Sequence, residues 1–408
     1  SDTQGPLRFR VRSFTETVSM NHAIHPKLDI HPLEDPYPVK FTKEDCRKKI
    51  VLVPNTSHAF CRIMSAAMRG QHIQAEPLEI GREEAIRLGK QYVHNDICFP
   101  CQIVIGEALA ALKSGKYDGK EVAIGMGKYI GDCRLTHYSA LLRKALDDAG
   151  FHDVPILTND DVDYHNMHPG FRMSLGSAIR LAFALPVIDV LEELLRKIRP
   201  YEKVAGSTNR AFEKGMDAVV EGLELHGISG VEKGFKKAID LMNQGKYDRT
   251  NRRSRVLIDG EYLLNFHPGA NHDIEDYLEH NGFENIEAHM TDVIQKSYFY
   301  LDAQIKEYKL KKPLNKKIWF STVDTVFDMA HNMADAIAKK HPLYTPACRM
   351  PDLVKASDPI INHTFDAGEG VLIPGEILHH AKDGCRSFVI LQPFGCLPNH
   401  VVGRGISK

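Results

Sequence analysis

The fold class follows from one stretch, residues 122–157, whose sequence is VAIGMGKYIGDCRLTHYSALLRKALDDAGFHDVPIL. It begins with a short apolar segment, 122–125, and continues through a glycine-containing loop into an amphipathic segment, 138–149. A second apolar segment follows at 154–157. A strand, a loop, a helix and a second strand in this order predict a βαβ unit, in which the two strands are parallel.

The same order of apolar strand, loop and helix recurs along the chain. An apolar segment at 51–55 precedes an amphipathic one at 59–69, and one at 256–258 precedes a helix expected at 272–281. A similar pattern begins at 388–391. Strands that alternate with helices of about 10–15 residues are typical of parallel sheets covered by helices on both faces. Longer helices, with apolar residues at helical spacing, are expected at 174–198, 209–225, 230–245, 290–309 and 322–340.

We therefore predict an α/β fold with two Rossmann-like or flavodoxin-like parallel-sheet domains that carry helical insertions. Residues 1–47 are rich in proline, histidine and charge, and are expected to form an N-terminal arm or linker. The first α/β domain, with a helical tail, is expected at 48–250, and the second, with a helical insert, at 251–408. Because the chain begins at Ser1 without an initiator methionine, we expect it to be a fragment of a longer polypeptide.

Composition narrows the class of partner and the compartment. The 408 residues include 52 basic and 53 acidic side chains, and the net charge of −1 argues against a dedicated nucleic-acid or anionic-membrane surface. No apolar run is long enough to cross a bilayer, and the polar start has no signal peptide. We expect a cytoplasmic protein, whose eight cysteines are then thiols or metal ligands rather than disulfides.

The sharpest local motif is Cys98-Phe99-Pro100-Cys101, directly before a predicted helix at 103–112. The N–H groups at a helix N-terminus favour thiolate, which is the form that binds metal. Iron–sulfur ligation is the interpretation we favour. A thioredoxin-like redox pair would need a strand before Cys98, and the residues there form a poor one. The third interpretation is two small buried residues at a packed helix start.

Cys133 and Cys396 occupy equivalent places, each in the loop that follows a predicted strand. Ligands of open α/β sheets gather beyond the carboxyl ends of strands, so two such cysteines could meet across a domain cleft. We predict that Cys98, Cys133 and Cys396 hold an iron–sulfur cluster in that interdomain cleft, with Cys101 as a fourth ligand. Taken singly, each is more often a buried small residue than a ligand.

Three further residues leave alternatives open. Cys348 and Cys385 could complete a larger cluster, although packing is the favoured role for both. His267 follows a predicted strand and could either line the cleft or fill a packing or turn role. The chain contains neither a phosphate-binding P-loop motif nor a dinucleotide-binding glycine motif, so we predict no ATP site within it.

Histidine pairs raise the question of zinc. The close pairs are His22 with His25, His165 with His168, and His379 with His380. The first two lack a cysteine pair at the spacing of a structural zinc site, and we expect solvated side chains. The third pair is adjacent in a predicted helix, so its members are expected to point in different directions and to be solvated as well.

Four segments resemble proteins related to the 2-hydroxyacyl-CoA dehydratases. They are residues 92–100 (YVHNDICFP), 131–134 (GDCR), 260–271 (GEYLLNFHPGAN) and 392–400 (QPFGCLPNH). The likeness also includes residues 112–118, 141–146 and 368–370, and it extends, in order, from about residue 48 to the end of the chain. Within this family the chain is most similar to the C-terminal, dehydratase-like part of large fused acyl-CoA dehydratase activase proteins, which are related to double-cubane cluster proteins.

The resemblance implies an oxygen-sensitive iron–sulfur cluster, of the 4Fe–4S type or a larger double-cubane type. Cys98, Cys133 and Cys396 match the ligand positions of the family. Cys101 departs from the pattern, because many relatives have an aliphatic residue there. A fourth thiolate would close the iron that the dehydratases leave open to substrate, and so would favour electron storage.

The resemblance also implies a function and partners. We expect an iron–sulfur reductase or electron-transfer module that receives low-potential electrons from an ATP-hydrolysing activase. Arg134 could offset the negative charge of the cluster. One alternative is a 2-hydroxyacyl-CoA dehydratase that acts on an acyl-CoA through a ketyl radical, and another is a metal-free or zinc-bound structural scaffold. A homodimer is compatible with the resemblance.

Overall fold

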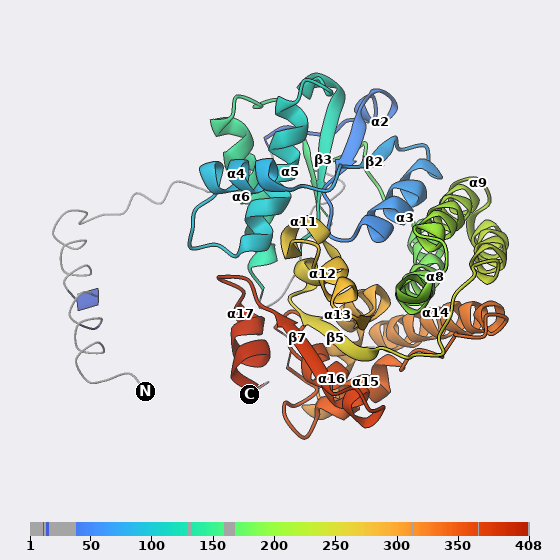
Figure 1. Ribbon diagram of the computed structural model, residues 1–408. Helices are drawn as coiled ribbons and strands as arrows, with labels where there is room; N and C mark the ends of the chain where they lie inside the picture. Colours follow the sequence, from blue (N-terminus) through green and yellow to red (C-terminus); the bar gives the residue numbers. More distant parts are fainter. Residues whose placement is uncertain are drawn as a thin grey trace. The chain divides into compact units, whose positions relative to one another are not determined.

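Two parallel β-sheets organise residues 39–408 of the computed structural model, as the alternation of strands and helices predicted (Figure 1). The first contains β1 Ile50–Val53, β2 Ala75–Pro77, β3 Val122–Met126 and β4 Ile156–Thr158, in the order β2-β1-β3-β4. The second contains β5 Ser254–Gly260, β6 Phe283–Glu287 and β7 Ser387–Leu391, in the order β6-β5-β7. Neighbouring strands in both sheets are parallel, which confirms the α/β class.

The structure describes residues 38–128, 133–158, 168–311, 314–365 and 367–406, together with Val11, Phe14 and Thr15. The chain divides into two units, Ser1–Pro38 and Val39–Lys408, and the second contains both sheets. Phe41, in the predicted arm, belongs to the second unit and is fully buried there. None of the described helices combines the length and apolar character that a membrane crossing requires.

The helices of the first half position the segment that carries Cys98. They are α2 Asp45–Lys48, α3 His58–Arg69, α4 Glu83–Tyr92, α5 Phe99–Lys113 and α6 Tyr138–Asp148, with 3₁₀ turns at η1 Gly119–Glu121 and η2 Arg134–His137. Helices α4 and α5 meet backbone to backbone, since a Cβ on Gly89 would lie 1.9 Å from the carbonyl oxygen of Gln102. This close pairing fixes α5, whose N-terminal end carries Cys98.

A helical layer follows the first sheet. It consists of α8 Leu175–Ile198, η3 Arg199–Tyr201 and α9 Ser207–Asn243, joined by α13 Met290–Glu307 and α14 Leu314–Ala338. The two helices predicted at 209–225 and 230–245 are the arms of α9, which folds back at Gly227, where φ is 60°. The arms touch closely, because a Cβ on Gly215 would lie 2.8 Å from the Cβ of Ala238. Apolar side chains of α3, α8, α9 and α14 share the largest described core.

The second half contains shorter helices. They are α10 Tyr262–Phe266, α11 Pro268–Asn271, α12 Ile274–His280, α15 Met350–Ser357, α16 Leu372–Lys382 and α17 Leu397–Asn399, followed by the π-helical η4 His400–Ile406. The helix predicted at 272–281 begins later than expected. His272 and Asp273 have left-handed backbone, with φ of 56° and 55°, and therefore separate α11 from α12.

Candidate functional site

Cys98, Cys133 and Cys396 each lie immediately before a helix, in a connection between elements. Cys98 is the residue before α5. Cys133 follows β3 and caps η2, where its sulfur accepts a hydrogen bond from the Leu135 N–H at 3.5 Å. Cys396 follows β7 and precedes α17. The last two positions are those predicted from the strands, although residues 129–132 lie outside the described residues.

The loops that carry Cys98 and Cys396 touch through their backbones. The N–H of Phe99 donates to the carbonyl oxygen of Phe394 at 3.1 Å. A Cβ on Gly395 would lie 3.0 Å from the Cα of Cys98, and the φ of 78° at Gly395 also favours glycine. Figure 1 shows the segment between β7 and α17 reaching the helices of the first half. Two thiols far apart in the sequence are thus brought to one place.

The Cys133 loop joins the same group. The Arg134 side chain donates a hydrogen bond to the backbone carbonyl of Asp96, which ties this loop to the segment before Cys98. Burial raises the pKa of the Cys133 thiol to about 12, and the charge of Cys98 contributes to the rise. Burial likewise raises the pKa of Cys396, and the charge of Cys133 adds to it. The Phe99–Phe394 and Arg134–Asp96 hydrogen bonds bring the three loops together, and we call Cys98, Cys133 and Cys396 the cysteine trio.

Cys101 has a different environment from the trio. It lies in the first turn of α5 and is fully buried. Burial raises its pKa, and the charge of Cys98 is the one other contribution. Neither Cys133 nor Cys396 affects it. The structure therefore groups Cys98, Cys133 and Cys396, and it places Cys101 one turn into α5, next to Cys98 and near Tyr138.

Cys348 and Cys385 lie in other surroundings. The Cys385 thiol is buried at the start of β7 and lies 3.3 Å from the carbonyl oxygen of Ser387. Burial raises the pKa of Cys348 to about 12, and the carboxylates of Glu376 and Asp292 add to the rise. Neither thiol shares a described neighbour with the trio, so the packing role favoured from the sequence agrees with their surroundings.

Sequence analysis missed three side chains that surround the trio, namely Tyr138, Glu261 and Glu369. The Tyr138 hydroxyl lies 2.7 Å from the Cys98 sulfur, in a buried contact at the start of α6. A Glu369 carboxylate oxygen lies 3.7 Å from the Cys396 sulfur. The charge of Glu261 contributes to the raised pKa of all three thiols, after the larger effect of burial. Glu261 and Glu369 lie in segments that carry the resemblance, 260–271 and 368–370, but those segments do not place them at the thiols. Tertiary packing brings all three side chains there.

The two carboxyl groups make the site acidic. Burial raises the pKa of Glu261 to about 8, and the charge of Glu369 adds to the rise. Burial also raises the pKa of Glu369, although the charge of Lys296 opposes it. A thiol that acts as a nucleophile or redox partner needs a lowered pKa, which these surroundings do not provide. A bound metal ion reverses this balance, because coordination deprotonates a thiol.

The spacing of the sulfur atoms distinguishes two kinds of metal. A single zinc ion, bound at about 2.3 Å from sulfur, holds its thiolates about 4 Å apart. In the described part of the chain, the one group of three ligand atoms within 4.8 Å of one another belongs to His379, His380 and Asp383. Among the described residues, Cys98, Cys133 and Cys396 do not form such a group. Thiolates bound to different irons of one cluster stand farther apart than those on a single ion.

Two histidines have roles that differ from simple solvation. His168, predicted to be solvated, is fully buried, and its Nδ1 accepts a hydrogen bond from the Phe41 N–H at 3.3 Å. That prediction was wrong, because a contact distant in sequence covers the ring. His267, left open between the cleft and a packing role, is buried against Glu107. His22, His25 and His165 lie outside the described residues.

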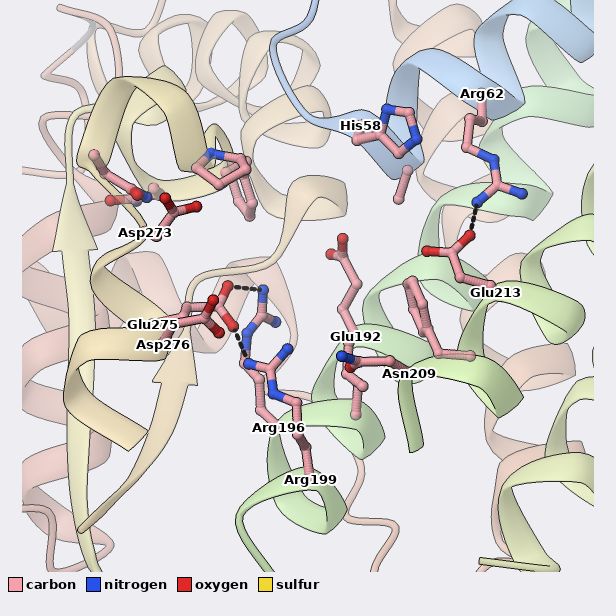
Figure 2. A pocket seen from close by; sticks show the side chains of 17 residues that line it. His58, Arg62, Glu192, Arg196, Arg199, Asn209, Glu213, Asp273, Glu275 and Asp276 are labelled. Atoms are coloured by element: carbon pink, nitrogen blue, oxygen red, sulfur yellow. Dashed lines mark hydrogen bonds and ion pairs between the residues drawn. The ribbon is translucent and has the colours of Figure 1, made fainter. Parts of the chain in front are cut away.

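A separate cavity of about 320 Å³ lies among α3, α8, α9 and the segment after β5 (Figure 2). Its charges are largely paired, as between Arg62 and Glu213 at 2.9 Å and between Arg199 and Glu275 at 2.9 Å. Glu192 extends into the cavity from α8, and burial raises its pKa to about 7. No cysteine lines this cavity, so the argument for function rests on the trio.

No protein-family model matches the chain, and no curated protein matches it. The resemblance drawn from the four segments therefore stays a prediction, and the function has to be argued from the site.

Proposed function

We propose that Cys98, Cys133 and Cys396 hold an iron–sulfur cluster, and that the protein is a reductase or electron-transfer module. The observation that carries this proposal is the hydrogen bond between the Cys98 and Cys396 loops, with Cys133 in the same buried group. Cys98 and Cys396 are buried and Cys133 is partly buried, and their pKa values are raised even though the charge of Arg134 lowers that of Cys98. Such thiols fit a cluster that supplies further positive charge itself.

The electron source is proposed to be an ATP-hydrolysing activase. The sequence offers no P-loop of its own, and the resemblance to fused activase proteins supplies the partner class. When bound, the cluster would supply one-electron transfer at low potential. The protein's own contribution is to hold the trio in a buried place and to exclude water from it. Glu261 and Glu369 keep two protonatable groups next to the thiols.

A second candidate, a 2-hydroxyacyl-CoA dehydratase, is favoured by the surroundings of Cys101. A dehydratase of this type needs three thiolates and one iron open to substrate, and of the trio only Cys98 lies next to the fourth thiol here. Adding a 2-hydroxyacyl-CoA to the anaerobic protein should then change its electron paramagnetic resonance spectrum. An unchanged spectrum would favour the electron-transfer module over the dehydratase.

The decisive experiment is metal analysis of protein prepared without air. Iron and acid-labile sulfide should be present in the parent and lost in Cys133→Ala and Cys396→Ala. Cys385→Ala is the matched control, because that thiol is also buried but contacts a strand carbonyl instead of the trio. Zinc in place of iron, or no metal in any preparation, would overturn the proposal and leave a structural scaffold.

A further inference from the structure

Four groups with metal-binding side chains lie on one face of α16 and the residue that follows it. Glu376, His379, His380 and Asp383 are spaced at i, i+3, i+4 and i+7, which places them along one stripe of a helix. One Nε2–oxygen distance is 3.7 Å, from His379 to Asp383, and another is 3.3 Å, from His380 to Glu376. Ligand atoms of His379, His380 and Asp383 all lie within 4.8 Å of one another.

The two histidines do not point apart, as their adjacency led us to expect. Their ring centroids are 5.1 Å apart, and the planes meet edge to face at 71°. Both side chains are partly covered, with 32% of His379 and 19% of His380 exposed. The pair therefore presents two imidazoles to one small volume, which a single ion could occupy.

Glu376 adds a second, independent observation. Its side chain is 6% exposed, and His380 is its one ionic partner among the described residues, with no arginine or lysine beside it. Two further buried carboxyls lie near it, those of Asp259 and Asp292. Burial raises the pKa of each well above its usual range, and the charge of Glu376 contributes to both rises. The charges of His289 and Arg349 oppose the rise for Asp292, and a bound cation would act in the same direction.

The end of the helix favours a cation as well. Helix α16 ends at Lys382, and the carbonyl groups of the last turn give this end a partial negative charge. The nearest arginine, Arg255, donates to the backbone carbonyl of Asp383 and so leaves the carboxylate of that residue facing His379. The helix C-terminus and the Asp383 carboxylate thus favour a metal ion, although Lys382 and Arg255 place positive charge at the same end of the helix.

We propose that His379, His380 and Asp383 bind one divalent transition-metal ion such as Zn²⁺, with Glu376 orienting the His380 ring. Imidazole nitrogen and carboxylate oxygen are ligands that zinc binds at about 2.0–2.2 Å. The three ligand atoms lie within 4.8 Å of one another. Small rotations of these partly exposed side chains would bring each atom to bonding distance from one shared ion. A carboxylate beside a metal-bound imidazole fixes its orientation and strengthens binding. This site is independent of the cysteine trio and of the proposed function.

The test is a zinc titration of the full chain, prepared without air and treated with chelator, in competition with a chromophoric zinc indicator. The parent should take up one equivalent of zinc that the double variant His379→Ala/His380→Ala does not. Asp383→Asn should lower the affinity for that zinc equivalent by about tenfold or more. A loss of this size is typical even when the changed group only orients a ligand. Equal uptake by the parent and the double variant would overturn the proposal.

Two controls keep the result specific. His280→Ala removes a histidine that also lies in the last turn of a helix, four residues after Asp276, and it should leave the zinc equivalent unchanged. Cys133→Ala and Cys396→Ala separate this site from zinc captured by empty thiols, because the His379-dependent equivalent should persist in both. Loss of that equivalent in the cysteine variants would assign the zinc to the trio and refute the site on α16. Zinc should also raise the thermal midpoint of the parent but not of the double variant, since a ligand stabilises the state that binds it.

Discussion

Nε2 of His267 lies 2.8 Å from Oε1 of Glu107, in a buried contact that joins the segment after β5 to helix α5. Nδ1 of the same ring accepts a hydrogen bond from the Ala270 N–H at 3.0 Å. Nε2 therefore carries the ring hydrogen and donates a hydrogen bond to the Glu107 carboxylate. Glu107 also accepts the backbone N–H groups of Asn55 at 2.7 Å and Gly81 at 2.6 Å. One carboxylate therefore connects loops of the first sheet to the second half.

Replacing Glu107 should destabilise the fold more than a typical substitution. In Glu107→Ala the Asn55 N–H, the Gly81 N–H and the His267 ring lose their shared acceptor in a buried place, with an expected cost of about 3–5 kcal/mol. Urea unfolding followed by circular dichroism measures the change. Glu84→Ala, which breaks an exposed pair with Arg87, is the control and should have little effect. Equal midpoints for the two variants would show that Glu107 does not join the halves.

Removing the Tyr138 hydroxyl should change the potential of the proposed cluster without removing it. Donation from Tyr138 to the Cys98 sulfur stabilises the more negative, reduced state, so Tyr138→Phe should lower the reduction potential. A hydrogen bond worth about 1 kcal/mol corresponds to roughly 40 mV for one electron. Redox titration monitored by paramagnetic resonance gives the value. An unchanged potential with full iron content would rule out this role for Tyr138 while leaving the cluster in place.

Adding one methyl group at Gly395 should separate the loops of the trio. Both Gly395 and Gly115 have positive φ, at 78° and 76°, so alanine costs about 1–3 kcal/mol of backbone strain at either. The Cβ added at Gly395 would lie 3.0 Å from the Cα of Cys98, whereas the Cβ added at Gly115 would have no atom within 4 Å. Gly395→Ala should therefore lower the iron content, and Gly115→Ala should affect stability alone. Equal iron in the two proteins would contradict the close approach that joins Cys98 and Cys396.

Glu192 should make stability depend on pH between about 4.5 and 7. Burial raises its pKa in the folded protein above that of the unfolded chain, so the folded state binds more protons in this window. Stability should therefore fall as the pH rises from 4.5 to 7 and stay lower above it. Glu192→Gln should remove this part of the dependence and stabilise the protein at pH 8. Denaturant unfolding at pH 5 and pH 8 tests it, with Glu221→Gln, exposed on α9, as the control.

Much of the fold could be predicted, because hydrophobic periodicity is a local property of the chain. The strand at 122–125, the helix at 138–149 and the strand at 154–157 all appear, as β3, α6 and β4, within a few residues of their predicted bounds. The helix expected from His272 was shortened by left-handed backbone at His272 and Asp273, which the apolar pattern does not encode.

The site was predictable only in part. The positions of Cys133 and Cys396 followed from the rule that loops after parallel strands meet at one edge. Tyr138, Glu261 and Glu369 could not be predicted, because their proximity to the thiols depends on how the two halves pack. The prediction that His168 is solvated was wrong for the same reason, because Phe41, far away in the sequence, covers the ring.

The contact between Phe99 and Phe394 has a consequence for the order of events during synthesis. Cys98 and Cys133 are synthesised together with the strands of the first sheet, but Cys396 follows only after β7, the third strand of the second sheet. A nascent chain can complete its first sheet while this thiol is still missing. Iron delivery to the proposed cluster would therefore have to wait until residue 396 has been synthesised, and a chain that stops before this residue would lack one of the three proposed ligands.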